Sequence, residues 1–202
     1  MRSAAYLWAA VLILIPGTVI VAAGAYSVEA TVEARAEKDA TMRDDPASPF
    51  NYEKHPVVFS PLHYFEPAAE WVFESQLEVY PEQEAITILD TKGRQREGHI
   101  YGHLSFTKDG TTHRVRVYRM VAKDEVYYAV WFTDQTTGES TYDVGRYLGF
   151  ELSEDPDHVY TLDFNAAFNP YCAYSPAYGC AIPREDDFID LAIEAGEKKW
   201  HD

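Results

Sequence analysis

The chain has 202 residues, of which 47% are apolar and 14% aromatic, and its formal net charge is −16. This length accommodates one compact domain with appendages, and the composition is sufficient for a sizeable core. Nucleic-acid binding needs a basic face, so the charge excludes it, and the charge also argues against docking on anionic lipid headgroups. An acidic surface either keeps the protein soluble or docks a basic partner, and both interpretations stay open.

The N-terminal stretch Ala4–Tyr26 contains no charged residue. As a helix it would extend about 34 Å, which is enough to cross a hydrocarbon core of about 30 Å. We therefore expect residues 1–26 to form an uncleaved transmembrane signal anchor. The competing interpretation is a signal peptide, because Ala23–Ala25 resembles a cleavage site, and cleavage there would give a secreted domain.

The charges beside this stretch predict its orientation. Arg2 precedes it, whereas Glu29 and Glu33 are the first charged residues after it. Positive residues stay on the cytoplasmic side of a membrane. We therefore expect a single-pass protein of the cell membrane with a cytoplasmic N-terminus and an extracytoplasmic, periplasmic C-terminal domain.

Val28–Arg43 is rich in alanine, glutamate, lysine and arginine, all of which favour helices. Pro46 ends this pattern, because the residue before a proline is pushed out of the helical region. We interpret residues 27–46 as a helical stalk that continues the membrane helix, and residues 47–202 as the extracytoplasmic β-rich domain.

Between Glu70 and Phe164 the pattern is that of β-strands separated by turn residues. Lys108–Gly110 is a hairpin turn between strands predicted at His99–Phe106 and Thr112–Val121. Val126–Phe132 is almost wholly apolar and aromatic, as in a central strand buried on both faces. Further strands are predicted at 71–80, 85–89, 146–152 and 159–164. A set of about seven short strands with no helix between them predicts an antiparallel sandwich or a partly open barrel.

The C-terminal region shows a helical pattern. Pro183 and the acidic residues after it suit the start of a helix, and Gly196 suits its end. An apolar stripe at helical spacing lies between them, formed by Phe188, Ile189, Leu191, Ala192 and Ala195. The expected fold class is therefore a mainly β domain with a C-terminal α-helix and a single N-terminal transmembrane helix.

Four motifs carry a resemblance to a known family. They are TYDVGRYL at 141–148, DFNAAFNPYCAY at 163–174, a second cysteine followed by a proline at 180–183, and AGEK at 195–198. In order and approximate spacing they resemble the signatures of DUF1684, a bacterial and archaeal domain-of-unknown-function family, over about residues 36–202. No general activity is attached to this family, so the resemblance implies no reaction. The matching positions are Thr141, Tyr142, Gly145, Arg146, Tyr147, Asp163, Asn165, Asn169, Cys172, Cys180, Gly196 and Glu197.

The chain also departs from these signatures. Asp143 and Val144 stand where the family often has glycines, and residues 181–184 replace a proline-rich run. If those glycines let a ligand approach the backbone, this chain has lost that ability.

The candidate ligand-binding residues are polar side chains of these motifs: Tyr142, Arg146, Asp163, Asn165 and Asn169. They could converge on a small polar ligand, with Glu139 and Glu197 joining as acid and base. In the competing interpretation the asparagines and aspartate hold turns by bonding backbone amides, and Arg146 pairs with Asp163. Carboxylates for glycoside hydrolysis could be drawn from the same set, but the sequence does not give their separation.

Cys172 and Cys180 are the candidate disulfide, because such bonds persist outside the cytoplasm. The bond would close a loop of about nine residues and stabilise the fold by ~2.5 kcal/mol. Free thiols, or a metal or redox pair, are the alternatives. His99, His103 and His113 could meet across a hairpin as a metal site or be exposed strand residues. We expect neither a metal nor another cofactor.

The sequence favours an accessory or structural subunit of a larger membrane protein complex, without intrinsic catalysis. Its partners would be other membrane subunits, contacted through the N-terminal helix and the acidic domain, with respiratory or photosynthetic assemblies as candidate hosts. The alternative function is a small-ligand-binding module or hydrolase with a polar site around Arg146, Asp163, Asn165 and Asn169.

Overall fold

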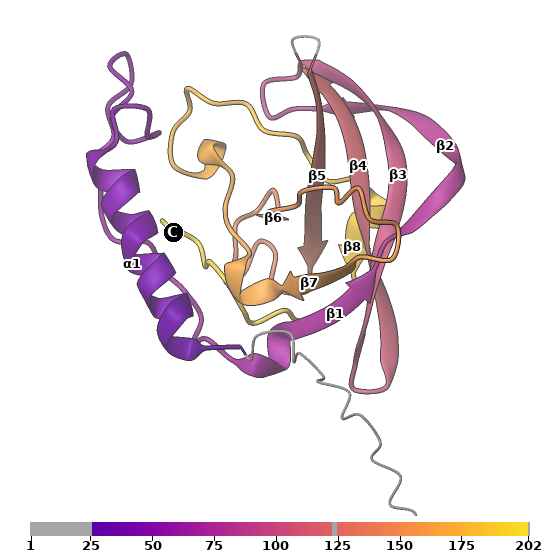
Figure 1. Cartoon of the computed structure of the whole chain (residues 1–202). Coiled ribbons are helices and arrows are strands. Elements are labelled where there is room, and N and C mark those ends of the chain that lie inside the picture. Colours follow the sequence, from indigo (N-terminus) through magenta and orange to yellow (C-terminus); the bar gives the residue numbers. More distant parts are fainter. Residues whose placement is uncertain (1–25, 123–124, 202) are drawn as a thin grey trace, which may run out of the picture.

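The structure is a computed structural model that describes residues 26–122 and 125–201. In these residues the helix α1 (Val28–Asp44) stands beside a curved β-sheet (Figure 1). The strands are β1 (Val72–Gln76), β2 (Glu78–Leu89), β3 (Gln95–Lys108), β4 (Thr111–Ala122), β5 (Glu125–Asp134), β6 (Arg146–Leu148), β7 (Val159–Asp163) and β8 (Phe188–Ile189). Short 3-10 turns occupy Ala69–Trp71, Phe164–Ala166, Tyr171–Ala173 and Glu185–Asp187.

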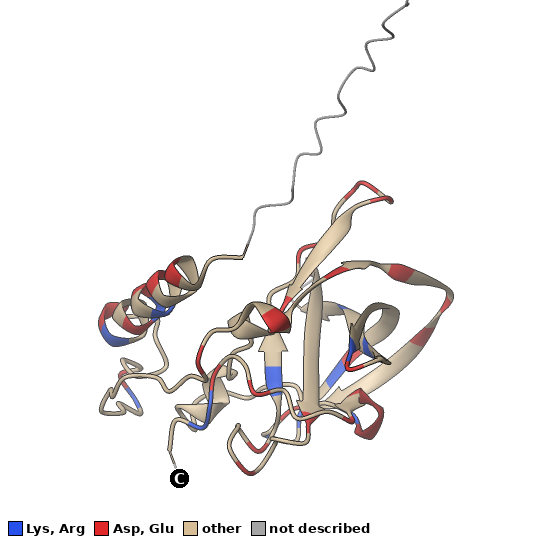
Figure 2. Cartoon of the chain, turned by 90° about the horizontal axis from the view of Figure 1, so that it is seen from below, with Lys and Arg blue, Asp and Glu red and all other residues tan. Residues whose placement is uncertain are grey.

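The strands β2 to β6 form one antiparallel sheet in chain order, and β8 adds a short parallel pairing to β5. The sheet curls into a half-barrel, and the antiparallel pair of β1 and β7 lies across its lower end in Figure 1. Acidic residues are spread over the helix, the strands and the loops, with basic residues between them (Figure 2). The domain is therefore mainly β with a distributed negative charge.

The hairpin between β3 and β4 turns at Asp109 and Gly110, whose φ angles are 50° and 79°. Two-residue hairpin loops of this kind need positive φ, which glycine adopts freely and aspartate tolerates. Lys108 pairs with Thr111 directly beside the turn. The hairpin predicted at Lys108–Gly110 is confirmed.

The curl of the sheet coincides with irregular pairing near Gly102. The register shifts between Val79 and Glu84 on β2 and between Ile100 and Gly102 on β3. Such bulges bend a strand and increase its twist. A Cβ atom added at Gly102 would overlap the carbonyl oxygen of Glu78 and lie 3.1 Å from Cα of Val79. Glycine at this position therefore permits the close crossing of β2 over β3.

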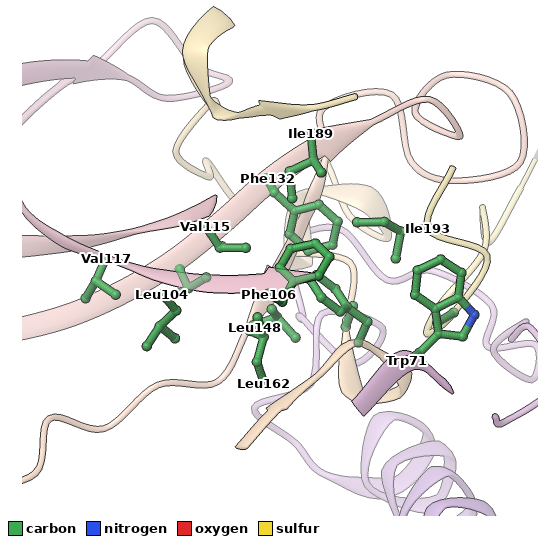
Figure 3. Packing of buried hydrophobic residues seen from close by; sticks show 14 residues of the cluster. Trp71, Leu104, Phe106, Val115, Val117, Phe132, Leu148, Leu162, Ile189 and Ile193 are labelled. Carbon is green, nitrogen blue, oxygen red and sulfur yellow. The ribbon is translucent and has the colours of Figure 1, made fainter. Parts of the chain in front are cut away.

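The main apolar core lies between the sheet and the β1–β7 pair (Figure 3). Phe164 packs against the rings of Trp71, Phe106 and Phe132, with centroids 6.5, 4.9 and 5.5 Å away. Truncating a buried aromatic ring of this kind costs about 3–5 kcal/mol. The other buried members are Leu104, Val115, Val117, Val130, Leu148, Leu162, Ala167, Ile189, Ile193 and Ala195.

The central strand β5 serves two cores. Val130 and Phe132 belong to the main core, whereas Trp131 belongs to a second cluster on the opposite face with Tyr118 and Met120. All three β5 residues are buried. The predicted burial of this strand on both faces is confirmed for them.

The helix predicted at Val28–Arg43 is present as α1. The side chain of Ser27 accepts a hydrogen bond from the amide of Ala30 at 3.1 Å, which caps the first turn. The chain leaves the helix at Asp45, in extended conformation before Pro46. This ending follows the restriction that proline places on the residue before it.

The helix α1 is docked along the β domain (Figure 1). Met42 is buried in a third apolar cluster with Phe50, Leu62 and Tyr174. Arg35 adds polar contacts to the domain, because it donates to the carbonyls of Phe65 and Asn165 at 2.8 and 3.1 Å. The segment expected as a stalk is therefore packed against the domain.

The predicted C-terminal α-helix is wrong. Its region forms the 3-10 turn Glu185–Asp187, the short strand β8 and an irregular segment up to residue 201. The carbonyl groups of Ile193 and Ala195 accept hydrogen bonds from the buried guanidinium of Arg146 instead of from amides four residues further on. Of the predicted stripe, Ile189 and Ala195 lie in the core, whereas Phe188 and Ala192 are exposed.

The predicted transmembrane helix is also corrected. In the stretches 26–122 and 125–201, no helix combines the length and apolar character needed to cross a membrane. Apart from Tyr26, the predicted span at Ala4–Tyr26 lies outside the described residues. This finding contradicts the expected fold class with a spanning helix and the expected location as a single-pass protein of the cell membrane.

Candidate functional site

The side chain of Arg146 lies at the centre of a buried charge network and is only 1% exposed. One of its nitrogens donates to Oδ2 of Asp134 at 2.5 Å and to the carbonyl of Ile193 at 2.8 Å. Burial lowers the pKa of Arg146, and the charge of Asp134 opposes that shift. Since the guanidinium is enclosed and paired inside the protein, its contacts are those of a structural group.

Glu197, in the AGEK motif, forms a second buried network. Its Oε1 atom accepts from Lys38 at 2.5 Å and from the hydroxyl of Tyr64 at 3.4 Å. Its Oε2 atom accepts from the amide of Asn169 at 2.7 Å and from the hydroxyl of Tyr174 at 2.5 Å. Both carboxylate oxygens are therefore occupied, and the network ties α1 to the C-terminal segment.

The polar side chains predicted as ligand-binding in the DFN motif make hydrogen bonds to backbone groups of the protein. Asp163 accepts from the amide and the side chain of Asn165 at 2.8 and 2.9 Å. The side chain of Asn165 also bonds both the amide and the carbonyl of Ala68 at 2.9 Å. The side chain of Asn169 donates to the carbonyl of Lys198 at 2.8 Å. Arg146 pairs with Asp134 and not with Asp163, so these residues do not converge on one ligand position.

Tyr142 lies beside the two cysteines. Its hydroxyl donates to Sγ of Cys172 at 3.7 Å, and the amide of Cys172 donates to Sγ of Cys180 at 3.2 Å. The amide of Cys180 donates to the hydroxyl of Thr91 at 3.2 Å. Both cysteines are half-buried free thiols in this structure. The disulfide stays a prediction, and the two residues lie close together as it requires.

The two thiols differ in their electrostatics. Hydrogen bonds from the Cys180 thiol, from Tyr142 and from Thr91 lower the pKa of Cys172 to about 7, against a smaller effect of burial. The bond to Cys172, burial and the neighbouring charge raise the pKa of Cys180. Cys172 is therefore the thiol that ionises first.

An aromatic cleft of about 470 Å³ lies next to this pair. We use the name for the hollow between strands β5 and β6 and the segment Pro170–Ala181. Its size lies in the range of small-molecule sites, which are mostly apolar with a few polar groups. The residues that give it its character are Arg96, Tyr127, Tyr128, Trp131, Tyr147, Phe150, Phe168, Tyr171, Tyr178 and Cys180.

Arg96 is the cationic group of the aromatic cleft. It donates to the carbonyl of Gly179 at 2.7 Å and to Oδ2 of Asp90 at 3.3 Å. Although burial lowers the pKa of Arg96, hydrogen bonds to Asp90 and Tyr127 raise it by more. Arg94 contacts the same carboxylate at 2.7 Å. Two arginines thus share one aspartate, which leaves this end of the cleft positively charged in an acidic protein.

Sequence reasoning missed the aromatic cleft. The tyrosines of the VYYAVWF stretch and those between Cys172 and Cys180 were visible, but the two segments are separated by about forty residues of chain. Only the folded chain brings them together. Their shared richness in tyrosine was the one signal that could have linked them.

A second cavity, of about 400 Å³, lies under α1. Its charged groups are Arg35, Lys38, Asp163 and Glu197. Lys38 is paired with Glu197, and Arg35 donates to two backbone carbonyls. These groups already bond one another or the backbone, so the cavity has the contacts of a helix docking surface.

The three histidines of the possible metal site are not brought together. On the paired strands His99 faces Arg119, His103 faces Arg116 and His113 faces Phe106. Across residues 26–122 and 125–201 no group of three or more histidine, cysteine or acidic side chains could hold a metal ion.

A half-barrel domain with buried charge networks and an aromatic cleft defines the structural class of this protein. Its residues 57–198 match the family described as "Protein of unknown function (DUF1684)". The chain belongs to this family, which its motifs predicted.

The domain is similar to a solution NMR structure of the uncharacterized protein from gene locus rrnAC0354 of Haloarcula marismortui. The TM-score is 0.60 and the sequence identity 32%, with 84% of this chain and 93% of that chain covered. A comparison with curated proteins gave no match.

Proposed function

We propose that this domain is a small-molecule-binding module whose ligand lies in the aromatic cleft. The ligand would be a flat, apolar molecule that carries an anionic group. The observation that carries the proposal is the pairing of many aromatic side chains with one cationic end at Arg96. Aromatic faces stack on flat apolar molecules, and a guanidinium binds carboxylate, sulfonate or phosphate groups.

Charge favours an anionic ligand over a neutral one. Arg94 and Arg96 share the carboxylate of Asp90, and Lys92 lies on the same turn and donates to the carbonyl of Ala177. The local balance is therefore positive, whereas the whole chain carries −16.

The test uses the full chain and anilinonaphthalene sulfonate, a flat aromatic anion, in a fluorescence titration. Tyr171→Ala and Arg96→Gln should each weaken binding about 2- to 10-fold, as expected for one aromatic or charged contact. Tyr171 is 44% exposed, so its loss should spare the core.

Two variants outside the cleft serve as matched controls. Phe188→Ala removes an aromatic side chain of similar exposure, at 50%, and Arg114→Gln removes an exposed arginine from β4. Both should bind like the wild type. The proposal fails if the control variants weaken binding as much as the cleft variants do, or if the cleft variants bind normally.

The accessory-subunit role expected from the sequence is a second proposal, without the membrane helix. It is favoured by Arg146, Asn165 and Asn169, whose side chains all bond within the domain. Glu197 likewise has both oxygens occupied, which argues against its use as a general base. A C-terminally tagged chain, purified from its native source and run on a native gel with mass spectrometry, tests this role. Stoichiometric partners in a large assembly would support it, and migration alone near 23 kDa would overturn it.

A further inference from the structure

Cys172 and Cys180 are arranged unequally, although they lie side by side. The sulfur of Cys172 accepts a hydrogen bond from the hydroxyl of Tyr142 at 3.7 Å and another from the thiol of Cys180. The sulfur of Cys180 accepts a hydrogen bond from the backbone amide of Cys172 at 3.2 Å. The sulfur of Cys172 therefore faces a hydroxyl donor and a thiol donor, and Cys180 supplies the thiol donor.

Hydrogen bonds from several donors stabilise a thiolate. Burial raises the pKa of Tyr142, so its phenol keeps its proton and remains a donor. The charged neighbours are Arg96, which acts on Cys180, and Asp143, which acts on Tyr142. The balance of these groups places the negative charge of the pair on Cys172.

Neither cysteine is fully enclosed by the protein. Each cysteine is half-buried, and Cys180 lines the wall of the aromatic cleft. The segment between them contains Pro176 and Gly179 and is fastened at its end by Thr91, which donates its amide to the carbonyl of Cys180 at 3.0 Å. An accessible thiolate with a second thiol in hydrogen-bond contact is the arrangement that thiol–disulfide exchange requires.

We propose that Cys172 and Cys180 form a thiol–disulfide exchange site, with Cys172 as the attacking and Cys180 as the resolving residue. The co-reactant is a disulfide of a small thiol or of an exposed peptide segment. This activity is separate from ligand binding in the aromatic cleft and does not depend on it.

The exchange proceeds in two balanced steps. The Cys172 thiolate attacks one sulfur of the substrate disulfide, whose S–S bond breaks, and the departing thiolate takes a proton from solvent. Cys180 then loses its proton and attacks Sγ of Cys172, which releases the second half of the substrate as a thiol. The two cysteines are oxidised to one disulfide, and the substrate is reduced by two electrons to two thiols.

The first test measures alkylation of the reduced full chain by iodoacetamide, with the modified cysteine identified by mass spectrometry. At about pH 7, Cys172 should react at least about tenfold faster than Cys180, because the reaction rate follows the thiolate fraction. In urea the two rates should become equal. Equal rates in the folded protein would overturn the proposal.

The second test uses oxidised glutathione as the co-reactant. The wild type should form the internal disulfide, Cys180→Ser should accumulate glutathione on Cys172, and Cys172→Ser should react at least about tenfold more slowly. Tyr142→Phe should shift the pH midpoint of Cys172 alkylation upward. Equal adduct formation in the two serine variants, or an unchanged midpoint in Tyr142→Phe, would contradict the assigned roles.

Discussion

Arg146 and Asp134 form a buried ion pair, 2.5 Å long, that joins β6 to the end of β5. The same guanidinium holds the carbonyl groups of Ile193 and Ala195, so one side chain fastens the irregular C-terminal segment to the sheet. Asp134 is fixed in turn by the amide of Thr136 at 2.7 Å. The motif that first suggested a ligand site therefore has a clear role in holding the fold together.

Arg146→Met should destabilise the domain strongly. Removing one partner of a buried ion pair leaves the other charge uncompensated, which costs about 3–5 kcal/mol. The unfolding free energy from urea titration measures the effect. The matched control is Arg114→Met on the exposed side of β4, which should change stability by less than about 0.5 kcal/mol. Similar losses in both variants would contradict the structural role of Arg146.

Gly102→Ala should destabilise the domain by about 1–3 kcal/mol, because the added methyl group would enter the backbone of β2. It would overlap the carbonyl oxygen of Glu78, which cannot move without opening the bulge. Gly149→Ala is the matched control, since nothing lies within 4 Å of a Cβ atom there. Thermal unfolding should show a lower midpoint for the first variant and an unchanged or higher midpoint for the second.

The sequence predicted those elements whose conformation is determined by neighbouring residues in the chain. The hairpin at Asp109–Gly110, the alanine- and glutamate-rich helix and the apolar strand β5 are of this kind. The C-terminal segment was mispredicted because Ile189, Leu191 and Ala195 fit a helical spacing equally well. Its true path depends on hydrogen bonds from Arg146, about fifty residues earlier in the chain. No local pattern carries that information.

The same reason explains the candidate sites. The sequence grouped polar motif residues by their chemistry, and the structure shows Asn165 and Asn169 bonded to backbone segments far along the chain. The closeness of Cys172 and Cys180 was predictable, because only eight positions separate them and a turn lies between, while the disulfide itself stays a prediction. The hydroxyl of Tyr142 beside Cys172 was not predictable, since it depends on how two loops pack.

His103 should make stability depend on pH. Its side chain is 3% exposed, and burial lowers its pKa in the folded protein below the ordinary value of 6.5. Glu78 opposes this shift, while Arg114 and Arg116 add to it. The unfolded chain therefore binds a proton more readily. The stabilising contribution is complete above the unfolded-state pKa and is lost as the pH falls through 6.5 toward the folded-state pKa.

Urea unfolding at about pH 7.5 and about pH 5 measures this dependence. His103→Gln should lose less stability between the two pH values than the wild type does. His55→Gln is the control, because His55 is exposed, and it should follow the wild type. If the stability of His103→Gln changed with pH as much as that of the wild type, a group other than His103 would cause the pH dependence.

Glu197→Gln should lower the stability of the domain strongly, although glutamate and glutamine side chains have the same shape. Each oxygen of Glu197 accepts hydrogen bonds from two donors, Lys38 and Tyr64 on one side and Asn169 and Tyr174 on the other. An amide nitrogen cannot accept, so in either orientation it would face two donors. Lys38 would also lose its counter-charge. We expect a loss of about 3–5 kcal/mol in urea unfolding, as for a broken buried ion pair.

Two further variants separate the causes of that loss. Tyr174→Phe removes one donor and keeps the carboxylate, so it should cost only about 1–3 kcal/mol. Glu194→Gln changes an exposed glutamate of the same segment and should be neutral within about 0.5 kcal/mol. If Glu197→Gln were as stable as Glu194→Gln, the carboxylate would not be the link between α1 and the C-terminal segment. Its hydrogen bonds would then be consequences of packing that other contacts already determine.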